Sequence, residues 1–250
     1  VIDPIPEFSR SADRLHVPVR INPGATVALA VAPAGWSGAE TSESSRVAST
    51  DGVEVRMDSS GALRLRSFRT GPASVTFADG GTIDWQVPEL PSLGKPLHQM
   101  ELEVEVWTPG RERFTTEKKA LSLGTVPVRP WTEEPALRDV SGTGRYRSRI
   151  EVPATDAIPG AILDLGPVFN TVVVSLNGTP LPAVDPLTGT VDLGPMLREG
   201  TNILEIEVST TLNNVLRITN PDVFSVNDRQ PFGLAEPPRL RPYLERVLRR

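Results

Sequence analysis

Three glutamates that alternate along one predicted strand are the residues most open to catalytic chemistry. Glu101, Glu103 and Glu105 occupy every second position of the run MELEVEVW, so neighbouring Cα atoms on one side of the strand lie about 6.6 to 7 Å apart. That spacing falls within the range of a carboxylate pair that hydrolyses a glycosidic bond with inversion. A working pair also needs a cleft and one carboxyl group with a raised pKa. Because glutamates that alternate with apolar residues are usually a solvated face, we favour that interpretation here and for Glu205 and Glu207.

Other catalytic arrangements have little support in the sequence. The chain has two histidines, His16 and His98, and no cysteine. Only these two histidines could serve in a Ser-His-Asp arrangement, and without cysteine there is no thiolate nucleophile or zinc site of the cysteine type. A Gly-x-Ser-x-Gly nucleophile elbow is absent as well. We expect both histidines at the surface or in a local hydrogen bond, and we predict no catalytic residue in this chain.

Sugar binding needs different groups, namely an aromatic platform and planar polar side chains that hydrogen-bond adjacent hydroxyls. Aromatic residues make up 5% of the chain. Trp131, in a loop, is the preferred platform over Trp107, which points outward from its strand by alternation. A loop tryptophan more often plugs the end of a sandwich core, and that alternative stays open. The polar candidates are Arg145, Asp185, Asn213, Asn214 and Arg217. For the two asparagines we favour a structural role, as a loop cap or bulge, over sugar binding.

The sequence Asn177-Gly178-Thr179 fits two patterns, an acceptor for an N-linked glycan and the tight turn of a β-hairpin. A type I′ turn needs positive φ at both central residues, which Asn and Gly tolerate best. The preceding run VVVSL supplies an incoming strand. We therefore favour the turn, since glycosylation would also require a host that performs it.

The elements that position these residues are predicted to be strands. The 25 prolines and 20 glycines are spread between short runs of valine, leucine and isoleucine, and this composition indicates turns between the strands of an all-β protein. In NILEIEVS, Leu204, Ile206 and Val208 alternate with two glutamates, as in an antiparallel sandwich with one wet face per sheet. The one helical pattern lies at 240–250, where Pro242 could occupy the first turn.

The proline-rich segment VPELPSLGKP, residues 87–96, indicates a domain boundary. We predict a β-rich region over residues 1–97 and a second, jelly-roll domain over residues 98–250. In the first region, alternation and turn residues predict a half-buried strand at 14–21 and a second strand at 26–32.

Charge and hydropathy argue against two classes of partner. The net charge of −5 comes from 26 basic and 31 acidic residues that are interleaved along the chain, so no broad cationic face is expected and nucleic-acid binding is disfavoured. No apolar run approaches the roughly 20 residues that cross a bilayer, which gives no support to a membrane partner. The opening VIDPIPEF has neither an initiator methionine nor the features of a signal peptide, so we expect a fragment or processed product. The absence of cysteine does not fix a compartment, and a secreted or cell-surface location as part of a larger protein stays open.

A series of motifs from residue 126 onward occurs in an order that resembles a known family. The motifs are Ser141-Gly-x-Gly-x-Tyr146, Leu163-Asp-Leu-Gly166, Asn177-Gly178, Asp192-Leu193, Gly200-x-Asn202, Thr211-Leu-Asn-Asn214 and the closing QPFGLAEPPRL. Together they span about half of the chain, which is more specific than any single motif. The region resembles the galactose-binding-like jelly roll at the C-terminal end of large glycoside hydrolases similar to family-106 α-L-rhamnosidases.

The resemblance implies a family that hydrolyses rhamnosides with inversion and with calcium, in a barrel upstream of the jelly roll. None of the family's catalytic residues maps onto a motif here. The expected role is a noncatalytic accessory or carbohydrate-binding region that supports or extends the substrate site of an upstream catalytic domain in the same polypeptide. An autonomous carbohydrate-binding module and a purely structural scaffold are the alternatives. A structural calcium stays open, because no stretch has EF-hand spacing and a site built from distant loops leaves little local trace.

Overall fold

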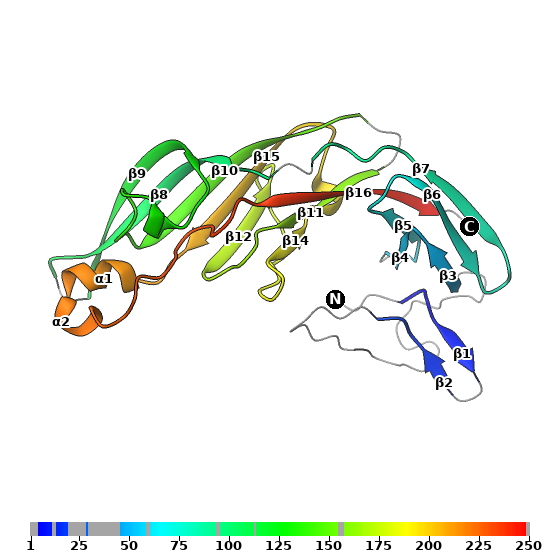
Figure 1. Ribbon diagram of the computed structural model, residues 1–250, viewed down its shortest axis with the longest axis horizontal. Coiled ribbons are helices and arrows are strands. Elements are labelled where there is room, and N and C mark those ends of the chain that lie inside the picture. The colour runs from blue at the N-terminus through cyan, green and yellow to red at the C-terminus, as the bar shows by residue number, and fades with distance from the viewer. Residues whose placement is uncertain are drawn as a thin grey trace. The chain divides into compact units, whose positions relative to one another are not determined.

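The computed structural model describes residues 5–11, 14–19, 29, 46–58, 61–93, 96–112, 114–154 and 158–248. Its regular structure is almost entirely antiparallel β-strand with two short helices, so the all-β prediction is confirmed (Figure 1). The chain divides into two compact units. The first comprises Val1–Pro91, Ala154–Gly160 and Pro242–Arg250, and the second comprises Ser92–Pro153 and Ala161–Arg241. This division differs from a single boundary between residues 97 and 98, because the chain returns to the first unit twice.

The first unit is built from short antiparallel strands around its own core. Its strands are β1 (Ser9–Ser11), β2 (Arg14–His16), β3 (Val47–Asp51), β4 (Glu54–Met57), β5 (Leu63–Ser67), β6 (Gly71–Phe77), β7 (Thr82–Val87) and the greater part of β16 (Arg239–Leu248). β1 pairs with β2, β6 lies between β3 and β7, and β5 lies between β4 and β16. Alternate residues of these strands, such as Leu65, Val75 and Leu244, are fully buried and form the core.

The helix predicted over residues 240–250 is wrong, because residues 239–248 form β16. A buried ion pair fixes this strand beside β5: Arg66 Nε and Nη2 donate to Oε1 of Glu245 at 2.8 and 2.6 Å. The Arg66 guanidinium also lies 3.8 Å from the centre of the Tyr243 ring. The two charged partners are separated by 179 residues, so local periodicity contains no sign of the pairing.

The strand predicted at 14–21 is shorter and more exposed than expected. β2 covers only Arg14–His16, and Leu15 is 43% exposed. The second strand predicted at 26–32 lies, apart from Leu29, outside the described residues.

The second unit is dominated by one antiparallel sheet of six strands in the order β13-β12-β15-β10-β8-β9. These strands are β8 (Gln99–Pro109), β9 (Thr116–Pro127), β10 (Gly142–Val152), β12 (Thr171–Leu176), β13 (Thr179–Pro180) and β15 (Gly200–Ser209). β11 (Ile158–Asp164) pairs with β14 (Thr190–Asp192). The helices α1 (Asn213–Thr219) and α2 (Pro221–Phe224) follow β15.

Alternation along the central strands gives the six-stranded sheet one buried face and one polar face. In β15, Leu204, Ile206 and Val208 are fully buried, whereas the glutamates between them are half-buried. β8 repeats the pattern, with buried apolar residues between exposed glutamates. The predicted arrangement of core and solvated faces is therefore confirmed in these strands.

The Asn177-Gly178 pair forms the predicted hairpin turn between β12 and β13. Both residues have positive φ, 52° and 77°, as a type I′ turn requires. The Asn177 side chain is also engaged on both sides: Oδ1 accepts the Ile203 amide at 2.9 Å, and Nδ2 donates to Oδ1 of Asn202 at 3.0 Å. Asn202 of the Gly200-x-Asn202 motif is fully buried at the start of β15, where it links this hairpin to the Arg198 backbone.

Candidate functional site

Trp131, the predicted aromatic platform, lies in the core of the second unit. Its side chain is 1% exposed, and its Nε1 donates a hydrogen bond to the Tyr146 hydroxyl at 2.7 Å. A Cβ added at Gly144 would lie 2.5 Å from the indole, and one added at Gly233, where φ is 82°, would collide with it. The indole therefore has no exposed face on which a sugar could stack. Its position is that of the core plug that the sequence left open as an alternative.

The Ser-Gly-x-Gly-x-Tyr motif holds this plug in place. The buried Tyr146 hydroxyl also accepts the Leu234 amide at 3.3 Å, so it joins β10 to the loop that carries Trp131 and to the closing tail. Burial raises the pKa of Tyr146 to about 12, because the phenolate would lose its hydration. At the start of the motif, Ser141 Oγ accepts the amide of Val215 in α1. The motif residues thus make internal structural contacts.

The candidates Asn213, Asn214 and Arg217 all lie on α1, and all three bind backbone of the segment that follows α2. Asn214 is fully buried and forms a two-sided clamp on Gln230, donating to its carbonyl at 3.0 Å and accepting its amide at 2.9 Å. Asn213 Nδ2 donates to the Asp228 carbonyl, and Arg217 Nη1 donates to that of Ser225. For Asn214 this clamp agrees with the structural alternative weighed from the sequence.

Asp185 lies in the loop that leads into β14. Its Oδ1 accepts the Leu187 amide at 2.9 Å, and its backbone forms an isolated antiparallel bridge with Thr190. The Leu187 N–H, followed by the Thr188 hydroxyl, lowers the pKa of the Asp185 carboxyl group. This geometry is a side-chain turn on the surface.

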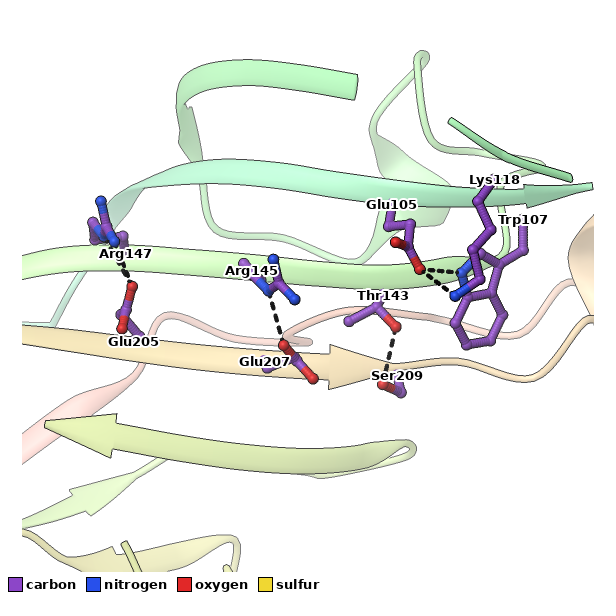
Figure 2. A network of polar contacts seen from close by, with 9 residues as sticks. All are labelled: Glu105, Trp107, Lys118, Thr143, Arg145, Arg147, Glu205, Glu207 and Ser209. Carbon is purple, nitrogen blue, oxygen red and sulfur yellow. Dashed lines mark hydrogen bonds and ion pairs between the residues drawn. The ribbon is translucent and has the colours of Figure 1, made fainter. Parts of the chain in front are cut away.

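Arg145 alone among the six candidates lies on the polar face of the six-stranded sheet (Figure 2). It is directly opposite Glu207 of β15 on one side and Glu103 of β8 on the other. Arg145 Nε donates to Oε2 of Glu207 at 2.9 Å. No hydrogen bond or ion pair joins Arg145 to the other five candidates, so the structure does not gather the predicted set into one site.

The next row of the same face repeats this order of charges. Arg147 lies between Glu205 of β15 and Glu101 of β8. Its Nη2 and Nε both donate to Oε1 of Glu205, at 2.6 and 3.0 Å. These side chains stand on neighbouring strands about 4.8 Å apart, so carboxylates and guanidiniums alternate across the sheet.

A groove with a volume of about 380 Å³ follows these two rows. We call it the polar groove; its charged lining is Glu101, Glu103, Arg145, Arg147, Glu205 and Glu207, and Val173 and Ser175 line its β12 side. Its volume falls at the lower end of the roughly 300 to 1,000 Å³ typical of small-ligand pockets. The groove is a candidate binding site whose charged groups are held on strands rather than on loops.

At one end of the polar face, Trp107 and Lys118 enclose Glu105 (Figure 2). Lys118 Nζ and Trp107 Nε1 donate to Oε1 of Glu105 at 2.8 and 2.7 Å, and Nζ lies 5.2 Å from the centre of the indole ring. The hydrogen bond from Lys118, followed by that from Trp107, lowers the pKa of Glu105. Trp107 is half-exposed, so it is the tryptophan available to a ligand on this face.

Comparisons with known proteins give structural likeness only. No family model matches the chain, and no curated protein matches it. Among solved structures, it is similar to a rhamnosidase from Novosphingobium sp. PP1Y, with 17% identity and a TM-score of 0.45, over 79% of this chain and 24% of that one. It is also similar to a β-galacturonidase from Eisenbergiella tayi, with 20% identity, a TM-score of 0.36, and coverage of 63% and 25%. A β-glucuronidase from Faecalibacterium prausnitzii is similar as well, with 16% identity and a TM-score of 0.37, over 63% of this chain and 32% of that one.

This chain spans about a quarter of that rhamnosidase. It therefore resembles in structure a part of larger glycoside hydrolases. The activities named for those enzymes belong to them, and the polar groove has to be interpreted from its own residues.

Sequence reasoning missed Arg147 and preferred Trp131 to Trp107. The signal for the polar face was the alternation in MELEVEVW, RYRSRIEV and NILEIEVS, which puts every polar-groove charge on the outward side of its strand. What the sequence does not contain is the register of β10 against β8 and β15, and that register places Arg145 and Arg147 between glutamates.

Two further expectations concern a metal ion and a membrane. Within the described residues, no three His, Asp or Glu side chains lie close enough together to hold a metal ion, so the side chains there do not fit a carboxylate calcium site. No helix in the same part of the chain is long and apolar enough to span a membrane.

Proposed function

We propose that this chain is a noncatalytic accessory region of a glycoside hydrolase similar to α-L-rhamnosidases, and that its polar groove contacts the glycan. The observation that carries the proposal is the alternation of carboxylates and guanidiniums along the groove. Each sugar hydroxyl both donates and accepts hydrogen bonds, so neighbouring hydroxyls suit a surface on which acceptors and donors alternate. Glu101 and Glu103 supply acceptors. Arg145 and Arg147 supply the N–H groups that do not bond to Glu207 and Glu205.

The electrostatics of the polar face support a binding role rather than hydrolysis. A general acid needs a raised pKa, whereas Lys118 and Trp107 lower the pKa of Glu105. Glu205 and Glu207 are each bonded to an arginine. On this proposal the catalytic partner is an upstream domain of the same polypeptide, as the order of the sequence motifs implies.

Calorimetric titration of the purified chain with L-rhamnose and with a rhamnose-containing oligosaccharide tests the proposal. We expect saturable binding, and we expect the double variant Arg145→Ala/Arg147→Ala to weaken it at least about tenfold, or 1.4 kcal/mol. Arg69→Ala is the matched control, because it removes an exposed arginine that pairs with Asp51 in the first unit. Repeating the titration with calcium and with a chelator shows whether a metal contributes. Equal binding by the double variant would place the glycan elsewhere.

A structural scaffold is the second candidate. It is favoured by the finding that Trp131, Asn214 and Tyr146 are all used in internal contacts. Absence of binding at millimolar ligand would support this role. Hydrolysis of a rhamnoside by the purified chain, lost on changing one of its own glutamates, would contradict both candidates.

A further inference from the structure

The formal charges that line the polar groove do not cancel. Four glutamates contribute four negative charges and two arginines contribute two positive charges, so the groove carries a formal charge of −2. The next glutamate along β8, Glu105, lies outside the groove lining and has its own cation in Lys118. The excess negative charge therefore belongs to the groove itself.

This excess lies on the β8 side of the groove. Arg145 and Arg147 are both bonded toward β15, to Glu207 and Glu205. Across from them, Glu101 and Glu103 neither accept a hydrogen bond nor form an ion pair with any described residue, although the register places each directly opposite an arginine. A ligand that enters the groove thus meets two carboxylates that no hydrogen bond ties to a cation, about one strand spacing from the guanidiniums.

We propose that the polar groove selects neutral, polyhydroxylated glycans and rejects glycans that carry carboxylates, an inference that rests on the proposed function. A uronate that reached Arg145 would have to compete with Glu207 and would also lie beside Glu103. Binding it would bring the groove to −3, within the screening distance of about 8 Å at physiological salt. A neutral sugar uses the same acceptors and donors without this repulsion.

A rhamnogalacturonan oligosaccharide, which alternates rhamnose with galacturonate, provides a matched pair of probes. The native oligosaccharide and its carboxyl-reduced form differ only in whether a carboxylate or a hydroxymethyl group is present. We expect the reduced form to bind at least about tenfold more tightly in calorimetric titrations at low salt. Because the effect is electrostatic, the ratio should shrink as the ionic strength rises toward roughly 0.5 M.

The variant Glu101→Gln/Glu103→Gln tests the cause. It removes both of these negative charges and keeps hydrogen-bonding groups of the same size, so the native and carboxyl-reduced oligosaccharides should bind within about threefold of each other. Glu117→Gln is the matched control, because Glu117 is an exposed residue of β9 outside the groove. It should leave the tenfold ratio unchanged. Circular dichroism checks that each variant is folded, and Glu103→Gln alone serves if the double variant is not.

The possible outcomes separate the two proposals. If the native acidic form binds as well as or better than the reduced form, the charge selectivity is overturned and the groove still binds glycans. If the ratio is tenfold but unchanged by Glu101→Gln/Glu103→Gln or by salt, the selectivity does not arise from these carboxylates and the inference is likewise overturned. If neither form binds, the proposed function itself fails.

Discussion

Replacing Trp131 with alanine should destabilise the second unit strongly, because Trp131 is a core plug. The side chain is 1% exposed, its Nε1 bonds to Tyr146 at 2.7 Å, and Phe232 contacts its ring edge-on at a centroid distance of 6.4 Å. Truncating such a buried aromatic residue costs about 3 to 5 kcal/mol. This is a large share of the roughly 5 to 15 kcal/mol that stabilises a typical domain. Tyr146→Phe should cost less, about 1 to 3 kcal/mol, since it leaves the Trp131 and Leu234 donors without their acceptor.

Urea unfolding followed by far-ultraviolet circular dichroism measures these losses without relying on tryptophan fluorescence. Trp107→Ala is the matched control, because Trp107 is half-exposed on the polar face and its loss should cost about 1 kcal/mol. Glycan titrations run on the same variants separate stability from binding. The reasoning is refuted if Trp131→Ala stays folded, loses less than about 1 kcal/mol and no longer binds glycan, since Trp131 would then be a platform.

Three further predictions concern stability. The unfolded chain releases the tyrosine proton near pH 10 whereas the folded pKa of Tyr146 is about 12, so the free energy of unfolding should fall by roughly 3 kcal/mol as the pH rises between these values. Denaturant titrations of Tyr146→Phe over the same range should lack this component. Asn177→Asp should lower the thermal midpoint by the equivalent of about 1 to 3 kcal/mol, because a carboxylate would face Oδ1 of Asn202, and the exposed substitution Asn227→Asp should not. Arg66→Ala should lower the free energy of unfolding by about 3 kcal/mol or more, because it leaves the buried Glu245 with only Arg64, 3.7 Å away. The control Arg69→Ala should lower it by less than about 1 kcal/mol. Calorimetric scans measure both losses.

The features that the sequence predicted well are those encoded within a few residues. The period of two in NILEIEVS places Leu204 in the core and Glu205 outside it, and the backbone tolerance of Asn177 and Gly178 specifies the hairpin turn. Both depend on local stereochemistry, which adjacent residues determine.

The features that the sequence predicted poorly depend on contacts between distant residues. β16 is held by Glu245 against Arg66, a partner in the other half of the chain, and this pairing outweighs the weak helical pattern at 240–250. Likewise, the first turn of α1 is tied to Ser141, which accepts the Val215 amide across 74 residues of sequence. Trp131 had two open interpretations because its loop position was predicted but the glycines and Tyr146 around it were not.

The candidate site was only partly accessible to sequence reasoning for the same physical reason. Arg145 was chosen as a planar polar side chain, and the glutamates of β8 and β15 were recognised as a solvated face. The register that places Arg145 between Glu103 and Glu207 joins three strands, and no local pattern specifies it.

The most direct test of the account is a nuclear magnetic resonance titration that follows side-chain N–H signals of the labelled chain as a neutral rhamnose-containing oligosaccharide is added. The polar groove should respond, so the Nε–H signals of Arg145 and Arg147 should shift with saturation. The indole signal of the buried Trp131 should stay in place. Perturbation of the Trp131 indole with unchanged arginine signals would contradict the assignment of glycan binding to the polar groove.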